Sequence, residues 1–268
     1  MNTAAYLARI GIDAPPRDTT AQTLAALQAA HLTHVPYENL DILLGVPLSL
    51  DDDALFDKIV TRRRGGYCFE LGGLFAVLLR ELGFPVTEYF GRFHRDADPG
   101  VPMRRHRILR VTTSDAGDFI CDVGVGGVCP LLPLPFGPHT AEVPTEAVRE
   151  RDRAWRIRAD AFYGHMVEEY RHDAWAPYYS FTEEPQVTVD YVTTSFWCEA
   201  SPDSPFRAAP IVCVQTPTGR KTIRDGVYRE FDGERVREEP IGDLSALLAE
   251  KFGIVLPPAG DSAIAIRR

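Results

Sequence analysis

The sequence predicts an α+β fold in which helices come first, a sheet or barrel follows, and a small mixed unit ends the chain. Three observations support this order. Apolar residues recur at helical spacing through about the first 85 residues. From residue 86 to about residue 190, short runs rich in β-branched and aromatic residues alternate with Pro and Gly. Beyond that point, strand-like runs are mixed with one helical pattern.

Length and composition fit one large or two ordinary globular domains. The chain has 268 residues, of which 45% are hydrophobic, and a domain takes roughly 150 residues. The net charge is −9, whereas a duplex-binding surface carries a basic excess, so we expect no nucleic-acid partner.

Targeting signals are absent from the sequence. No apolar run approaches the roughly 20 residues that span a bilayer. The N-terminus lacks the basic start and apolar stretch of a secretory signal. We therefore expect a cytoplasmic protein that has no membrane partner.

Helix signals dominate the first third of the chain. Thr20 can cap a helix whose apolar side includes His31. Residues 34–45 read as a connection, because Pro36 resists helix continuation. Acidic residues at 51–53 suit the first turn of a further helix. The helices expected here are residues 3–10, residues 20–31 and one that begins near residue 51.

The strongest helix signal begins at Cys68. Apolar residues follow it at positions 71, 74, 75, 78, 79 and 82, which is helical spacing. Gly83 fits the C-terminal stop, and Pro85 follows it. Gly65 and Gly66 stand just before the helix. The sequence therefore predicts Cys68 at or next to a helix N-terminus, behind a glycine turn.

Strand signals fill the middle of the chain, and a last helix begins near Asp243. The adjacent acidic residues Glu168 and Glu169 read as part of a solvated face. The expected strands are residues 86–90, 107–111, 119–123, 155–157 and 186–189, and then 211–214, 221–223 and 227–231.

Five cysteines occur, at positions 68, 121, 129, 198 and 213, and none forms a CxxC pair. An odd number without paired spacing argues against a disulfide framework and against a structural zinc site. We therefore expect reduced thiols, no metal, and a reactive role for one thiol.

Cys68 is the candidate for that reactive thiol. A thiol attacks as its thiolate, which a helix N-terminus and nearby cations favour, and the arginine run 62–64 lies just upstream. Gly65 and Gly66 remove side chains, so an acyl group can approach the sulfur. Exposed N–H groups at a helix start can also hold an oxyanion. A buried structural cysteine beside a tight turn is the alternative on these residues alone.

His106 and Asp122 are the candidates for a base and for its orienting carboxylate. They lie in two expected strands joined by a short loop, which predicts a hairpin. Strand residues two apart share a face, so a suitable register brings the two side chains together. The carboxylate then fixes the imidazole tautomer. A half-exposed strand histidine beside an aspartate that starts a turn is the simpler interpretation. Cys121 is expected to point away from Asp122, into the core.

These candidates lie in segments that resemble the arylamine N-acetyltransferase family. The family's PFENL, RGGxCxE and DVGFG motifs correspond to three segments here, in the same order and with a histidine between the second and the third. SPDSPF and the closing FGIVL also resemble it, and together the matches span most of the chain. The matching segments are HVPYENLDILLG, RRRGGYCFE, HRILRV and CDVGVGG.

The resemblance implies a three-part fold with a catalytic triad. It implies a helical domain over residues 1–85 that carries the nucleophile, and a β-barrel domain over residues 86–190 that carries the histidine and the aspartate. It implies an α/β lid over residues 191–268. The triad, of the papain and transglutaminase type, is implied to be Cys68, His106 and Asp122. A structural ion pair between Glu38 and Arg64 is also implied.

The resemblance further implies ping-pong acyl transfer. An acetyl or other acyl group passes from an acyl-CoA co-substrate to Cys68, and an aromatic amine or hydrazine then takes it. No metal is implied. Two alternatives remain enzymes: an amide synthase of natural-product biosynthesis that takes its acyl chain from a carrier protein, and a cysteine hydrolase with a transglutaminase-like triad. A third is a non-catalytic binding module, against which the intact triad argues.

The sequence departs from the family pattern at several positions. Tyr37 replaces the phenylalanine of PFENL, and Val125 replaces the phenylalanine of DVGFG. Gly72 stands where an asparagine is frequent, and residues 191–197 do not match the usual pattern. Because valine is smaller than phenylalanine, we expect a larger pocket that accepts a bulkier acyl group or amine. By the resemblance, the residues at the pocket are Tyr37, Val125, Gly126 and Phe206.

Overall fold

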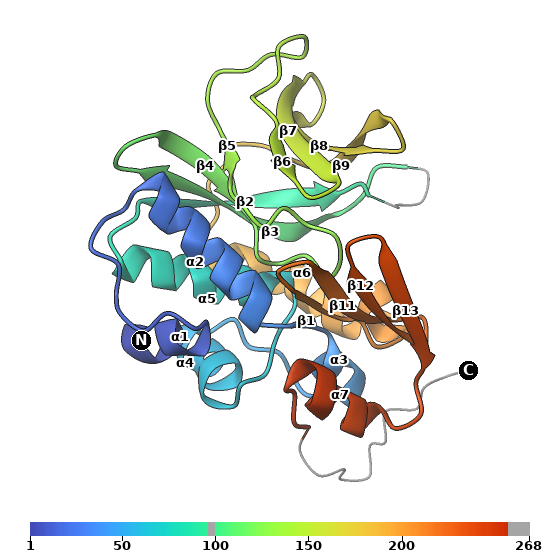
Figure 1. Ribbon diagram of the computed structural model, residues 1–268. Coiled ribbons are helices and arrows are strands. Elements are labelled where there is room, and N and C mark those ends of the chain that lie inside the picture. Colours follow the sequence, from blue (N-terminus) through green and yellow to red (C-terminus); the bar gives the residue numbers. More distant parts are fainter. Residues whose placement is uncertain (96–99, 257–268) are drawn as a thin grey trace.

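Three groups of elements make up the computed structural model, which describes residues 1–95 and 100–256 (Figure 1). Helices of the first part pack against one side of a large antiparallel sheet, and a smaller sheet lies beside them. This is the α+β order that the sequence predicts.

The helices carry the apolar faces that the sequence pattern predicts. In α5 the residues at 71, 74, 75, 78 and 79 are fully buried, and each such side chain contributes roughly 1.5–3 kcal/mol by leaving water. Among the helices of residues 1–95 and 100–256, none is long and apolar enough to cross a membrane. The elements are α1 (Thr3–Arg9), α2 (Ala21–His34), α3 (Leu40–Leu44), α4 (Asp52–Phe56), α5 (Cys68–Glu81), α6 (Thr188–Ala200) and α7 (Leu244–Phe252), with the π-helical turn η1 (Asp57–Thr61) and the 3₁₀ turn η2 (Pro205–Arg207).

The segment expected as a plain connection is more ordered than the sequence predicts. It contains the short strand β1 (Tyr37–Glu38) and helix α3, which Gly45 ends in the left-handed conformation at φ 68°. Pro36 does end α2, which stops at His34. The sequence therefore predicted the end of α2 correctly but missed β1 and α3, which are too short to show a hydrophobic period.

Eight strands of the described residues form the large sheet. Its order is β5-β4-β3-β2-β9-β8-β7-β6, and every pairing is antiparallel. Because β5 also contacts β7 near the other edge, the sheet curls into a nearly closed barrel. The strands are β2 (Val86–Phe93), β3 (Arg104–Thr113), β4 (Gly117–Cys121), β5 (Leu134–Pro135), β6 (Val148–Glu150), β7 (Arg153–Asp160), β8 (Gly164–Arg171) and β9 (Ala174–Phe181).

Glu168 and Glu169 lie on β8 and are buried, which contradicts the solvated face expected for them. They are 6% and 1% exposed. Arg156 and Arg158 each hold Glu168 through Nε at 2.8 Å, and Arg95 holds Glu169 through Nε at 2.7 Å. A buried carboxylate is tolerated when it is paired in this way, and the β7–β8 register places Arg156 directly opposite Glu168.

The strand expected at residues 186–189 is wrong, because helix α6 begins at Thr188. Gln186 makes only an isolated bridge to Glu88. The β-branched residues here raised the strand signal, but tertiary contacts override that preference. Tyr191 of α6 is buried, and its hydroxyl donates to the carbonyl of Tyr89 at 3.2 Å.

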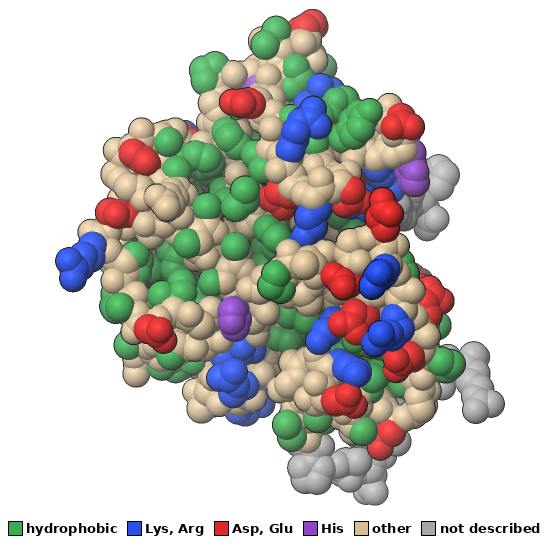
Figure 2. Space-filling model, viewed as in Figure 1, with side chains coloured by type: hydrophobic (Ala, Val, Ile, Leu, Met, Phe, Trp, Pro, Cys, Tyr) green, Lys and Arg blue, Asp and Glu red, His purple; other side chains and the backbone are tan. Residues whose placement is uncertain are grey.

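The smaller sheet ties the C-terminal part to the start of the chain. Its order is β1-β10-β11-β12-β13, so the strand of residues 37–38 forms one edge. Helix α7 covers it through a separate apolar cluster that includes Leu248 and Phe252. The outer strand is fully exposed and charged, and Figure 2 shows acidic and basic side chains interspersed over this sheet. Its strands are β10 (Val212–Gln215), β11 (Gly219–Arg224), β12 (Val227–Asp232) and β13 (Arg235–Pro240).

Candidate active site

Cys68 is the first residue of α5, as the sequence predicts. The backbone N–H of Tyr67 donates to Glu70 Oε2 at 3.1 Å and so satisfies one free donor of the helix start. The N–H of Glu38 donates to the carbonyl of Gly66 at 2.8 Å, which fixes the glycine turn before the cysteine. The thiol of Cys68 points toward the carbonyl of Arg105 on β3, with 3.5 Å between sulfur and oxygen.

The hairpin of β3 and β4 brings His106 and Asp122 together. Leu109 pairs with Cys121 in the register, so Asp122 follows one diagonal step from His106 on the same face. His106 Nε2 and Asp122 Oδ2 are 2.6 Å apart, and both residues are buried. The carboxylate accepts a hydrogen bond from the N–H at Nε2, which leaves Nδ1 of His106 as the ring nitrogen that can accept a proton.

Asp122 is itself held in place from two sides. Its Oδ1 accepts from the N–H of Gly124 at 2.8 Å. Its own backbone N–H donates to Gln28 Oε1, on α2, at 3.2 Å. Helix α2 and the loop after β4 therefore fix the carboxylate that orients the imidazole.

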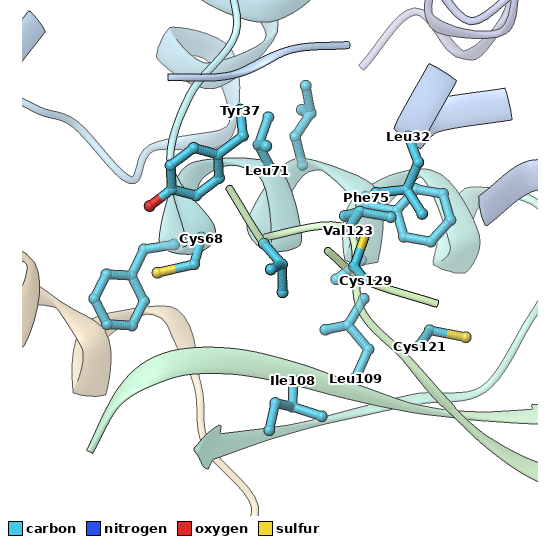
Figure 3. Close-up of a cluster of buried hydrophobic side chains, with 14 of the residues drawn as sticks. Leu32, Tyr37, Cys68, Leu71, Phe75, Ile108, Leu109, Cys121, Val123 and Cys129 are labelled. Atoms are coloured by element: carbon cyan, nitrogen blue, oxygen red, sulfur yellow. The ribbon is translucent and has the colours of Figure 1, made fainter. Parts of the chain in front are cut away.

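A cavity of about 560 Å³ opens beside the thiol. Cys68 and His106 both line it, whereas Asp122 lies behind His106 and does not. The residues expected at the pocket also line it: Tyr37, Val125, Gly126 and Phe206. Figure 3 shows Tyr37 beside Cys68 at one side of the buried cluster, with Cys121 at the other side. Cys121 is fully buried in the core, as expected.

Glycines after Asp122 allow the loop to approach the nucleophile closely. A Cβ on Gly124 would stand 2.7 Å from Cys68 Cα, and a Cβ on Gly126 would stand 2.5 Å from the ring of Tyr37. Real Cβ atoms do not come so close to other heavy atoms. Close packing in this pocket therefore explains glycine at positions 124 and 126.

The expectation that the arginine run favours the Cys68 thiolate is wrong. Burial raises the pKa of the Cys68 thiol well above its usual value, and Cys198 raises it further. Arg105 is the cation that opposes this rise. Arg62 instead pairs with Asp57 at 2.8 Å, away from the sulfur. The surroundings of the buried thiol therefore favour its neutral form.

Arg64 belongs to a buried charge network behind the nucleophile. It pairs with Glu38 at 2.7 Å, which confirms the ion pair that the resemblance implies, and with Asp41 at 2.7 Å. Lys58 continues the network to Asp41 at 2.8 Å and to Glu70 at 2.7 Å. Glu70 also accepts the N–H of Tyr67. The network therefore runs from Glu38 on β1 to Glu70 in the first turn of α5.

Several residues at the site were not found from the sequence. Gln28 supports Asp122, and Phe93, Arg105 and Trp197 line the cavity. Phe93 and Trp197 come from segments with no matched motif, and Trp197 lies on the helix that the strand signal concealed. Arg105 adjoins His106 in the sequence, and that adjacency is the one signal that could have suggested it.

A thiol at a buried helix start, faced by a hairpin that carries an imidazole and a carboxylate, defines an α+β enzyme core of the papain and transglutaminase type. Comparison with known proteins narrows this class. The N-acetyltransferase family model matches residues 20–260. The chain belongs to the arylamine N-acetyltransferase family and is an acyltransferase.

Relatives match over nearly the whole chain. The arylamine N-acetyltransferase of Mycolicibacterium smegmatis is 36% identical over 267 residues, which cover 96% of this chain and 93% of that protein. The solved structure of the Salmonella typhimurium enzyme has a TM-score of 0.86 at 31% identity, covering 94% of this chain and 90% of that one. The Mycobacterium marinum enzyme in complex with CoA has a TM-score of 0.83 at 30% identity, covering 94% and 93%.

Proposed function

We propose that this enzyme transfers an acetyl or other acyl group from an acyl-CoA thioester to the nitrogen of an arylamine or hydrazine, through an acyl-Cys68 intermediate. One arrangement carries the proposal: Cys68 and His106 line the same cavity, and Asp122 Oδ2 lies 2.6 Å from His106 Nε2. The M. marinum relative was solved with CoA, which supports CoA as the carrier of the acyl group.

In the first half-reaction, His106 Nδ1 takes the proton of the Cys68 thiol. The thiolate attacks the thioester carbonyl carbon, and the oxyanion that forms is stabilised by the backbone N–H of Cys68 and by that of a loop residue. The carbon–sulfur bond to CoA then breaks, and the proton on His106 passes to the departing CoA sulfur. Because burial raises the pKa of Cys68, proton removal accompanies attack.

In the second half-reaction, the amine attacks the acyl-cysteine carbonyl. His106 takes the proton that the nitrogen loses, the Cys68 thiolate leaves, and His106 returns the proton to it. Aromatic amines are neutral near pH 7, so they attack without prior deprotonation. The product is an amide, and the enzyme regains its free thiol.

Initial-rate kinetics test this sequence of steps. Double-reciprocal plots against acetyl-CoA at several fixed amine concentrations are expected to be parallel, because CoA leaves before the amine reacts. Intersecting lines contradict the proposal. Acyl release as free acid at an amine-independent rate supports the cysteine hydrolase instead. Transfer from a carrier-protein thioester, but not from a CoA thioester, supports the amide synthase.

Val125→Phe is expected to narrow the acyl pocket. Val125 is 8% exposed and lines the cavity, so a phenyl ring there takes space from a long acyl chain. The ratio of kcat/KM for hexanoyl-CoA to that for acetyl-CoA should fall by about tenfold or more. Val143→Phe is the matched control, because Val143 is 67% exposed. An equal ratio in Val125→Phe and wild type contradicts the assignment of Val125 to the acyl pocket.

A further inference from the structure

Strand β3 carries four arginines, at positions 104, 105, 107 and 110, and three of them have acidic partners. Arg104 pairs with Glu184 at 3.4 Å. Arg107 donates from Nε to Glu88 at 2.6 Å, and Arg110 pairs with acidic residues on its neighbours. Within the described residues, by contrast, the guanidinium of Arg105 has neither a hydrogen bond nor an ion pair. Its contact is with the ring of Phe206, 5.5 Å from the centroid.

Arg105 lies at the reaction centre. It lines the cavity next to Cys68 and His106, and its own carbonyl oxygen is the group that the Cys68 thiol faces. Its charge acts on the site, because it opposes the rise in the pKa of Cys68 that burial and Cys198 cause. The residue is only partly exposed, and among the described residues its guanidinium has no acidic partner.

Three arginines stand among the described residues that line the cavity, although the chain as a whole carries a net charge of −9. They are Arg95, Arg105 and Arg224, and Asp203 is the carboxylate among the same described residues. Arginines that line a cavity attract anions. Arg95 pairs with Glu169 and Arg224 pairs with Asp225. Among the described residues, Arg105 is therefore the cavity arginine without an acidic partner.

A carboxylate is the partner that matches this geometry. A guanidinium presents a planar fork of N–H donors that binds both oxygens of a carboxylate at once. A substrate that supplies the carboxylate gains that interaction, whereas an uncharged analogue leaves the guanidinium unpaired.

We propose that Arg105 is a specificity-determining residue that binds a carboxylate group on the substrate, so that the enzyme prefers carboxylated substrates over neutral ones of the same size. The inference rests on the proposed acyl transfer. The carboxylate can be carried by the aromatic amine, as in an aminobenzoate, or by the acyl group, as in the half-thioester of a dicarboxylic acid. In both cases the carboxylate binds the guanidinium of Arg105.

The experiment compares kcat/KM for charged and neutral partners in two arms. The first uses acetyl-CoA with 4-aminobenzoate or with its methyl ester. The second uses aniline with succinyl-CoA or with butyryl-CoA. In at least one arm, Arg105→Gln is expected to lower the charged-to-neutral ratio by about tenfold or more, because a charged hydrogen-bonded pair is lost. The arm that responds identifies which substrate carries the carboxylate.

Two further variants make the experiment decisive. Arg104→Gln removes the same charge from the adjacent residue, which does not line this cavity, and should leave the ratios within about twofold of wild type. Arg105→Lys keeps the charge and should restore part of the ratio. Circular dichroism establishes that each variant is folded.

If Arg105 contacts the phosphates of CoA and not a substrate carboxylate, the charged-to-neutral ratios do not change. Both donors of the second arm carry the same CoA, so that contact lowers both rates and leaves both ratios unchanged. Unchanged ratios in Arg105→Gln, with transfer still occurring in wild type, overturn the inference about Arg105 alone. Absence of transfer from any donor to any amine in wild type overturns the proposed function instead.

Discussion

Asp122→Asn is expected to lower kcat/KM for acyl transfer by up to about 10⁴-fold, the loss that follows when the orienting carboxylate of such a triad becomes an amide. Asp122 accepts from His106 Nε2 at 2.6 Å. An amide can instead donate its N–H to that nitrogen, which moves the imidazole proton to Nδ1. The nitrogen expected to take the Cys68 proton is then already protonated. Steady-state kinetics with acetyl-CoA and an aromatic amine measure the loss.

Asp118→Asn is the matched control for this change. Asp118 lies on β4, whose last residue directly precedes Asp122. It pairs with Arg110 and is partly exposed outside the cavity. Its loss removes the same charge without touching the imidazole, so activity should stay within about twofold of wild type. A rate for Asp122→Asn within tenfold of wild type, in a folded protein, contradicts the role proposed for Asp122.

Arg64→Met is expected to lower the free energy of unfolding by about 3–5 kcal/mol, because it leaves buried Glu38 without its ion-pair partner and leaves Asp41 with Lys58 alone. Arg64 is 3% exposed and holds Glu38 and Asp41 at 2.7 Å each. A typical domain is stable by only about 5–15 kcal/mol, so the midpoint of urea unfolding should fall markedly. Equilibrium unfolding followed by tryptophan fluorescence measures the change.

Arg62→Met serves as the control within the same arginine run. Arg62 pairs with Asp57 at 2.8 Å, but its side chain is 54% exposed. Water screens that pair, so we expect a change of less than about 1 kcal/mol. Equal effects of the two substitutions would mean that the buried network does not hold the loop before Cys68.

Local sequence patterns predicted the parts of the site that depend on one element or on one pair of neighbours. Helical spacing after Cys68 placed α5 correctly, because a buried amphipathic helix needs that spacing. The hairpin holding His106 and Asp122 followed from two strand signals and a short loop, and its register is the one that brings both to one face.

Features that depend on distant contacts could not be predicted in this way. A strand was expected at residues 186–189 because β-branched residues occur there, whereas helix α6 begins at Thr188 and buries Tyr191. Arg62 and Arg64, which precede Cys68 closely in the sequence, pair with carboxylates, whereas Arg105 reaches the cavity from a strand. Proximity along the chain therefore misidentified the cation beside the thiol.

The central claim is that the acyl group passes through Cys68, and intact-mass measurement after mixing with acetyl-CoA tests it most directly. We expect one acetyl adduct on the wild-type protein, its absence in Cys68→Ala, and its disappearance when an aromatic amine is added. Amide formation by Cys68→Ala at the wild-type rate, or an adduct that persists in the presence of the amine, would contradict the account.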